Sequence, residues 1–239
     1  MKRFLKACLV SFVAFAVLAG TLPQSASAAS SSTVREAQTI LKKFGMPVGT
    51  VDGVWGSQTA RGLCAFRIVV GATPSRSGIT SSTMSTLRSY NSRYSKLQSI
   101  PAKTRSGKST YMYANQTCQA MLYVKGSRYQ KAMAISTGMA GHSTPNSTYT
   151  MGNTATGWYC SKQYPESCKN HTEGSFATSG KRFGNMYNRR HFVDGKYVHG
   201  STSVPTYPAS HGCIRVTIQD SDWMYDNVNS LPLIIEGRY

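Results

Sequence analysis

Apolar residues recur at helical spacing in the stretch that follows residue 30. One face of the first predicted helix carries Val34, Ala37, Leu41 and Phe44. We expect this helix to begin at a capping box, in which Thr33 caps the first turn and Glu36 reaches back to the Thr33 amide, and to end at Gly45. A second helix is predicted from about residue 57, and a third over residues 80–88. The pattern therefore predicts a small three-helix domain over residues 29–90.

Short apolar segments at close spacing dominate the second half of the chain. Strands are predicted over residues 111–113, 119–124, 131–136, 196–199, 216–218 and 233–236, with one helix over residues 220–228. This spacing predicts a mainly β sandwich or barrel over residues 109–239. Residues 91–108 are rich in Ser, Lys and Arg and lack apolar periodicity, which predicts a linker. The long polar stretch over residues 154–183 is typical of a functional loop.

The first 28 residues have the pattern of a secretory signal peptide. Lys2, Arg3 and Lys6 precede an apolar run over residues 7–19, and an Ala-Ser-Ala cleavage pattern ends at Ala28. The run is shorter than the roughly 20 residues that a membrane span needs, although an uncleaved anchor stays an alternative. We therefore predict that residues 1–28 are removed and that the mature chain is secreted to the cell wall or beyond.

The chain is strongly basic. It has 27 Lys and Arg against 9 Asp and Glu, which gives a formal net charge of +18. Loss of the three cations in the predicted signal peptide would leave +15. Such a charge favours anionic partners such as cell-wall polymers, and export makes nucleic acid the poorest candidate. We expect a monomer, and a cationic wall-binding protein without catalysis stays an alternative function.

The cysteine count is informative in an oxidising compartment. One of the six cysteines lies in the predicted signal peptide, so five remain, which is an odd number. Cys160 and Cys168 close a short polar loop and are expected to pair. Cys64 and Cys118 could then form a second disulfide, which would leave Cys213 as the free thiol.

Two short motifs near the end of the chain carry residues suited to acyl transfer. His199-Gly200 comes first, followed by Ser210-His211-Gly212-Cys213-Ile214-Arg215. A cysteine nucleophile needs a nearby imidazole that takes the thiol proton and returns it to the leaving amine. A tight glycine turn exposes backbone amides to an oxyanion. His199 and Cys213 are therefore the candidate base and nucleophile, and the backbone amides of Gly212 and Cys213 are candidate oxyanion donors.

This pair of motifs resembles the L,D-transpeptidase catalytic (YkuD-type) domain, and the resemblance covers residues 109–239. Two further segments, Ile135-Ser136-Thr137-Gly138 and Thr144-Pro145, are similar to segments of the same family. The resemblance implies that a peptidoglycan stem peptide forms a thioester with the enzyme and releases D-Ala. An amine acceptor would then give a 3–3 cross-link, whereas water would make the protein an L,D-carboxypeptidase.

The resemblance also assigns roles to individual residues. Cys213 would be the nucleophile and His199 the proton donor and acceptor, with the Gly200 carbonyl orienting the imidazole. The other motif side chains are expected to shape the pocket or bind substrate: Ser210, His211 and Arg215.

The loop between the first two predicted helices carries a second resemblance. Asp52-Gly53-Val54-Trp55-Gly56, together with Gln38 and Phe66, resembles the small peptidoglycan-binding (PG_binding_1-like) domain of wall hydrolases. Arg67 departs from this pattern, because the family usually has Gln after the Phe. The resemblance implies that residues 29–90 bind the cell wall.

A metal site is the competing interpretation of the motif histidines. His199, His211 and Cys213 are of the residue types that bind zinc, but a structural zinc site usually needs four ligands. The remaining candidates, His171 and His191, lie in a poorly patterned region. We therefore expect neither a metal nor a cofactor.

Overall fold

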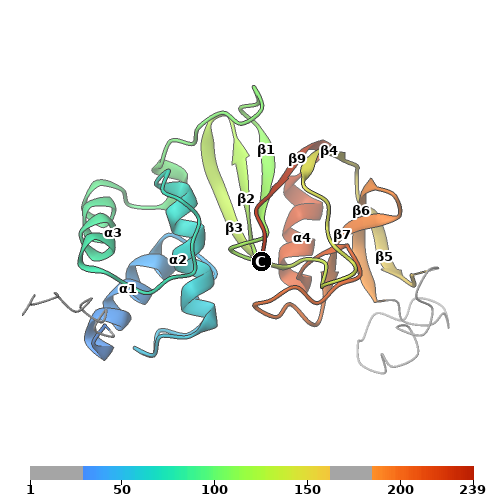
Figure 1. The fold of residues 1–239 in the computed structure, drawn as a ribbon. Helices are drawn as coiled ribbons and strands as arrows, with labels where there is room; N and C mark the ends of the chain where they lie inside the picture. Colours follow the sequence, from blue (N-terminus) through green and yellow to red (C-terminus); the bar gives the residue numbers. More distant parts are fainter. Residues whose placement is uncertain (1–28, 162–184) are drawn as a thin grey trace, which may run out of the picture.

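A computed structural model describes residues 29–161 and 185–239 (Figure 1). The predicted signal peptide and Cys168 lie outside these residues. Helices α1 (Ser31–Lys43), α2 (Ser57–Val69) and α3 (Ser81–Arg93) come first, followed by the short 3-10 helix η1 (Leu97–Ser99). None of the helices in the described part of the chain is long and apolar enough to cross a membrane.

The N-cap of helix α1 lies three residues before the predicted one. Ser30 is its N-cap, and the Ser30 hydroxyl accepts a hydrogen bond from the Thr33 amide at 3.3 Å. Glu36 instead forms an ion pair with Arg88 of α3 at 2.7 Å. The predicted capping box was wrong because a serine three residues upstream of Thr33 caps the helix.

Helix α3 continues past residue 90, where the helical domain was predicted to end. Its last turns carry Tyr90, whose ring packs edge-on against Phe66 of α2 with centroids 5.6 Å apart. The stretch after it, predicted as a linker over residues 91–108, is also packed, since Leu97 and Ile100 are 4% and 2% exposed. The chain from Tyr90 to Ile100 therefore packs in a core to which both the helices and the sheet contribute.

The described residues after the helices form a nine-stranded sheet in the order β4-β9-β1-β2-β3-β8-β7-β6-β5. The strands are β1 (Tyr111–Asn115), β2 (Ala120–Lys125), β3 (Arg128–Ser136), β4 (Ser147–Met151), β5 (Ala155–Tyr159), β6 (Met186–Val193), β7 (Lys196–Ser201), β8 (Ile214–Thr217) and β9 (Leu231–Glu236), with helix α4 (Ile218–Asn227) before β9. The mainly β fold is as predicted. Strands β4, β5 and β6 were not predicted, and β5 lies in the stretch that was expected to be a loop.

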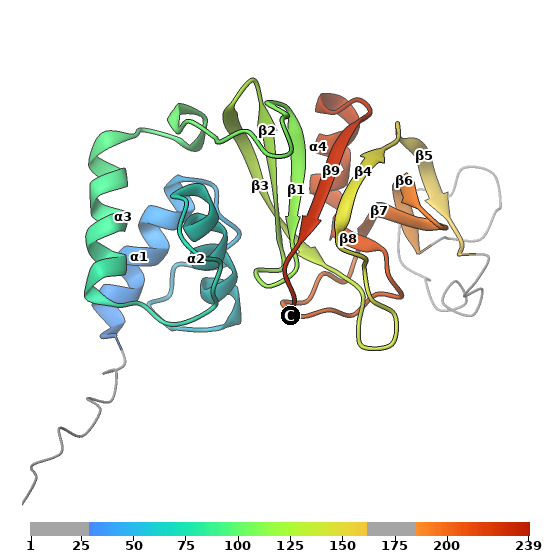
Figure 2. The same cartoon turned by 45° about the horizontal axis from the view of Figure 1, so that its top comes forward.

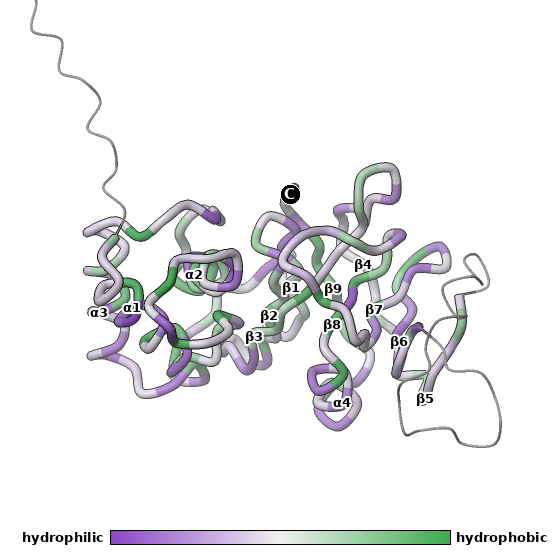
Figure 3. The backbone as a smooth tube through the Cα atoms, turned by 90° about the horizontal axis from the view of Figure 1, so that it is seen from below, coloured by the Kyte–Doolittle hydropathy of each residue, from purple (hydrophilic) through white to green (hydrophobic). Residues whose placement is uncertain are grey.

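The sheet curls around a core of its own. Strands β4 and β6 approach each other from different halves of the sheet, and the rings of Tyr149 and Phe192 lie 5.5 Å apart. Helix α4 packs against β6, β7 and β8. Figure 2 shows this curled sheet beside the helices, and Figure 3 shows hydrophobic residues along its central strands.

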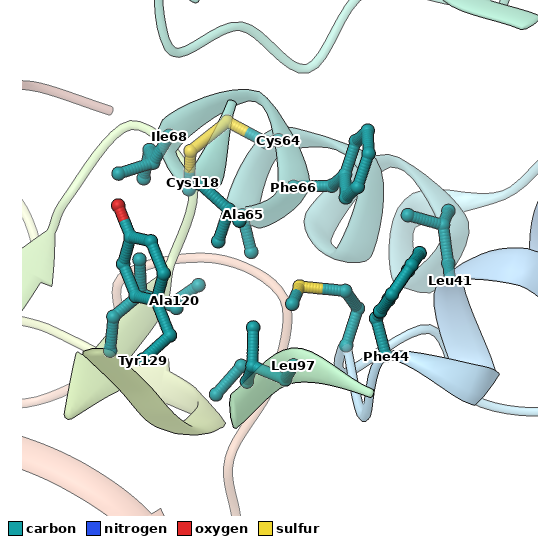
Figure 4. Close-up of a cluster of buried hydrophobic side chains, with 14 of the residues drawn as sticks. Leu41, Phe44, Cys64, Ala65, Phe66, Ile68, Leu97, Cys118, Ala120 and Tyr129 are labelled. Carbon is teal, nitrogen blue, oxygen red and sulfur yellow. A yellow bond between two sulfur atoms is a disulfide. The ribbon is translucent and has the colours of Figure 1, made fainter. Parts of the chain in front are cut away.

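Strand β2 is buried on both faces, and its alternate residues enter two different cores. Ala120 and Leu122 pack with residues of the helices, whereas Met121 and Tyr123 face the interior of the curled sheet. The helices therefore cover the outer face of β1–β3 and share a core with it (Figure 4). The two parts form one packed body.

A disulfide crosses this shared core. Cys64 of α2 is bonded to Cys118, which lies in the turn between β1 and β2, with the two Cα atoms 5.2 Å apart (Figure 4). Cys160 is also disulfide-bonded, while its predicted partner lies outside the described residues. Cys213 is the free cysteine of the described part of the chain.

Candidate active site

Strands β7 and β8 bring the two predicted catalytic residues to one face of the sheet. The strands are parallel, with Val198 opposite Ile214, and both of these side chains are fully buried in the core. Because successive side chains alternate between faces, His199 and Cys213 project from the other face. Both line a cavity of about 730 Å³.

The imidazole of His199 is buried and fixed in one orientation. The side chain is 4% exposed, and its Nδ1 lies 3.0 Å from the carbonyl oxygen of Gly200. A carbonyl can only accept, so Nδ1 carries the proton and Nε2 keeps its lone pair. Burial, with a smaller contribution from Arg215, lowers the pKa of His199 to about 4, although the Gly200 bond acts in the opposite direction. The imidazole is therefore neutral at pH 7.

The residue after His199 has no room for a side chain. A Cβ at Gly200 would lie 2.9 Å from the Cβ of Ser221 on α4 and 3.1 Å from the ring of Tyr187. The close approach of α4 thus leaves room only for glycine at the residue whose carbonyl orients the imidazole.

The thiol of Cys213 is mostly buried and protonated at rest. Burial raises its pKa above the ordinary value, and this outweighs a backbone hydrogen bond from Tyr197 and the charges of Arg215 and Lys196. The resting site therefore holds a neutral thiol and a neutral imidazole. The proton must leave the sulfur as the sulfur attacks.

The turn before the nucleophile is held by two hydroxyl groups. Gly212 has φ +102°, a conformation that favours glycine, and its carbonyl accepts a hydrogen bond from the Thr144 hydroxyl at 3.0 Å. The Ser210 hydroxyl donates to the Cys213 carbonyl at 2.6 Å and accepts from the Gly212 amide at 3.1 Å. The sulfur is therefore presented on a fixed turn.

This hydrogen bonding bears on two of the predicted roles. The Gly212 amide was a candidate oxyanion donor, but it donates to Ser210 and is not free to bind an oxyanion. Ser210 was expected to shape the pocket or bind substrate; it is 1% exposed, and its hydroxyl is used within the turn. Its effect on the pocket is to fix the turn.

The other predicted site residues line the same cavity. Arg215 lies opposite His199 on the adjacent strand. The ring of His211 packs edge-on against His142, with centroids 4.7 Å apart, so the loop around residue 142 forms another wall of the pocket. Within the described residues, no group of three or more His, Cys, Asp and Glu side chains is placed to hold a metal ion.

Sequence reasoning missed three residues of the pocket wall. Lys196, Tyr197 and Arg189 line the cavity, and the Arg189 guanidinium lies over the rings of Tyr159 and Tyr197 at 3.9 and 4.8 Å. The two-residue period from His199 could have placed Tyr197 on this face. No sequence pattern placed Arg189 in the pocket, because strand β6, which carries it, was not predicted. Among the described lining residues, Asp194 is the one acid, so the wall is cationic.

Fold and site together define a class of protein: a mainly β domain with a buried imidazole on one strand and a free thiol directly before the neighbouring parallel strand. The family model for the L,D-transpeptidase catalytic domain (YkuD) matches residues 109–235, more than half of the chain. The chain belongs to this family, whose members act on peptidoglycan. The matched segment leaves helices α1–α3 outside.

Two solved structures of L,D-transpeptidases are similar to this chain, and the first has the same fold. An L,D-transpeptidase from Xylanimonas cellulosilytica is 22% identical, with a TM-score of 0.52, and the alignment covers 90% of this chain and 98% of that chain. One from Stackebrandtia nassauensis is 18% identical, with a TM-score of 0.48 and coverages of 90% and 96%. No curated protein sequence gives a significant match.

Proposed function

We propose that the protein is a secreted L,D-transpeptidase that processes peptidoglycan stem peptides through a thioester on Cys213. The observation that carries this proposal is the neutral imidazole of His199, fixed by the Gly200 carbonyl on the strand beside the free thiol. Its Nε2 lone pair is available to take the thiol proton. Export is supported by the N-terminal signal pattern.

In the first step, the Cys213 sulfur attacks the carbonyl carbon of the L-centre of the third stem residue. His199 Nε2 takes the thiol proton as the carbon–sulfur bond forms. Since the Gly212 amide is held by Ser210, we assign the oxyanion to the Cys213 amide. The tetrahedral intermediate then collapses, the bond to D-Ala breaks, and His199 returns the proton to the leaving amine.

In the second step, an amine of a neighbouring stem attacks the thioester. His199 removes a proton from that amine, the carbon–sulfur bond breaks, and the thiol is regenerated. The product is a 3–3 cross-link. A cationic wall formed by Lys196, Arg189 and Arg215 favours stem peptides, which carry free carboxylates.

We also propose that the helical domain contacts the wall through the loop between α1 and α2. The Gln38 side chain holds this loop, since its oxygen accepts from the amides of Asp52 and Gly53 and its nitrogen donates to the Asp52 carboxylate at 2.8 Å. The loop then leaves Val54 and Trp55 63% and 37% exposed. An exposed indole on a fixed loop is suited to stacking on a sugar ring.

The direct test is to incubate the purified mature protein with a disaccharide-tetrapeptide. We expect released D-Ala and a cross-linked dimer, and neither product from Cys213→Ala. Release of D-Ala without dimer would instead support a carboxypeptidase. A wild-type protein that gives neither product between pH 5 and pH 9 would defeat the proposal.

A further inference from the structure

The face of α2 that meets the sheet carries a buried cation. Arg61, Cys64 and Ile68 are spaced three and four residues apart, which places them on one side of the helix. Arg61 is 4% exposed, and its guanidinium donates to the carbonyls of Pro205 and Ile135 in the catalytic domain. The helical layer thus reaches the loop over residues 202–209.

A second arginine of the helical layer binds the next residue of that loop. Arg76 donates to the Thr206 carbonyl at 2.9 Å, and it also donates to the Ser57 carbonyl at the start of α2. The carbonyl after that, of Tyr207, accepts from the Ser136 hydroxyl at 2.7 Å. Side chains therefore bind three successive carbonyls of one loop, and two of these side chains belong to the helical domain.

This loop connects the two halves of the active site. It begins after β7, which carries His199, and ends at the turn that presents Cys213. The amides of Ala209, its last residue, and of Ser210, which follows it, donate to the Thr137 carbonyl at 2.9 and 3.0 Å. The path of this loop therefore sets where the sulfur lies relative to the imidazole.

Helix α2 is also connected to this loop through its disulfide. Cys64 is bonded to Cys118. The side chain of the next residue, Gln119, forms two hydrogen bonds with Thr137. Its oxygen accepts from the Thr137 amide at 2.9 Å, and its nitrogen donates to the Thr137 hydroxyl at 2.8 Å. Thr137 in turn binds the end of the loop.

The arginine contacts are costly, which separates them from ordinary packing. Arg61 and Arg76 lie close enough to repel each other, and burial is the main cause that lowers the pKa of Arg61 to about 10. Within the described residues, neither forms an ion pair with a carboxylate, and the Arg61 Nε has no hydrogen-bond partner. An apolar side chain would avoid this cost but could not bind the loop carbonyls.

We infer that the helical domain positions the catalytic thiol, with Arg61 and Arg76 acting as positioning residues that hold the loop between His199 and Cys213. The inference deepens the proposed function and rests on it for its kinetic test. Neither arginine lines the cavity, so both act through the loop rather than on the substrate.

The kinetic test compares Arg61→Met with a matched control on the same helix. Arg67 also donates to three backbone carbonyls, those of Ser75, Ser77 and Gly78, but all of these lie in the helical domain. We expect Arg61→Met to lower kcat about 10- to 100-fold with KM within about twofold, because a small misplacement of reacting groups has this effect. Arg61→Lys should recover part of the loss, and Arg67→Met should keep the wild-type kcat.

A chemical test does not depend on the substrate. Iodoacetamide labels the free thiol, and we expect Cys213 in Arg61→Met to react faster than wild type with its pH profile moved to lower pH, because a loosened loop exposes the thiol. Arg67→Met should follow the wild type. If the wild type turns over no stem peptide, the proposed function fails while this comparison still stands.

Thermal unfolding defines the temperature at which every variant is folded. If Arg61→Met does not fold, the less buried Arg76→Met takes its place in both measurements. The inference is overturned if the folded variant matches Arg67→Met in kcat and in the alkylation profile.

Discussion

Acidification should destabilise the protein through His199. Burial lowers the pKa of this imidazole from an ordinary value near 6.5 to about 4 in the folded state. Between these values the unfolded chain binds the proton and the folded chain does not, so stability falls as pH falls from about 6.5 to 4. At about 1.4 kcal/mol for each pKa unit, the full effect is about 3 kcal/mol, of which about 2.5 kcal/mol is lost between pH 7 and pH 4.5.

The assay is urea unfolding of wild type and His199→Gln at pH 7 and pH 4.5, at constant ionic strength. Glutamine has a similar size and does not titrate. The difference between the two proteins in the loss of unfolding free energy from pH 7 to pH 4.5 therefore reports the contribution of the imidazole. We expect the wild type to lose about 2.5 kcal/mol more than the variant on acidification. An equal loss in both proteins would refute the assignment of a buried, neutral imidazole.

Four further outcomes follow from particular contacts. Replacing Cys64 and Cys118 with serine should cost about 4 kcal/mol in urea unfolding, because the bond closes a loop of 54 residues. Ser210→Ala leaves the Gly212 amide unpaired and should cost about 1–3 kcal/mol, with a lower kcat in the D-Ala release assay. Gly212→Ala should lower kcat, because φ is +102° and the new methyl group would meet Lys196 at 2.9 Å. Trp55→Ala should weaken sedimentation with purified wall at unchanged kcat.

Each of these has a contrary result. Unchanged stability of the serine pair would show that the disulfide constrains nothing in the unfolded chain. A Ser210→Ala or Gly212→Ala variant with wild-type kcat would mean that the turn does not place the sulfur. Full wall binding by Trp55→Ala would remove the α1–α2 loop from the proposed binding surface.

The sequence predicted the parts of the fold that have a local pattern. Apolar alternation located β1, β2 and β3. The two motifs located His199, which lies on β7, and Cys213, which directly precedes the neighbouring strand β8. Strand β5 was missed because its residues are half-exposed, so no apolar alternation marks it.

Other features depend on contacts between distant segments. Arg61 donates a hydrogen bond to the carbonyl of Pro205, which is 144 residues away in the sequence. No local sequence pattern near either residue predicts this contact. The Gly212 amide looked available from the glycine turn alone, whereas the side chain of Ser210 two residues earlier occupies it. Such competition between hydrogen-bond partners is decided by the three-dimensional path of the chain.

The central claim is that Cys213 forms a thioester with a stem peptide. Mass spectrometry of protein quenched in acid during turnover of a disaccharide-tetrapeptide measures this directly. We predict a single adduct on the Cys213 peptide, with the mass of the donor less D-Ala, and no adduct in Cys213→Ala. D-Ala release by Cys213→Ala at the wild-type rate would contradict the account.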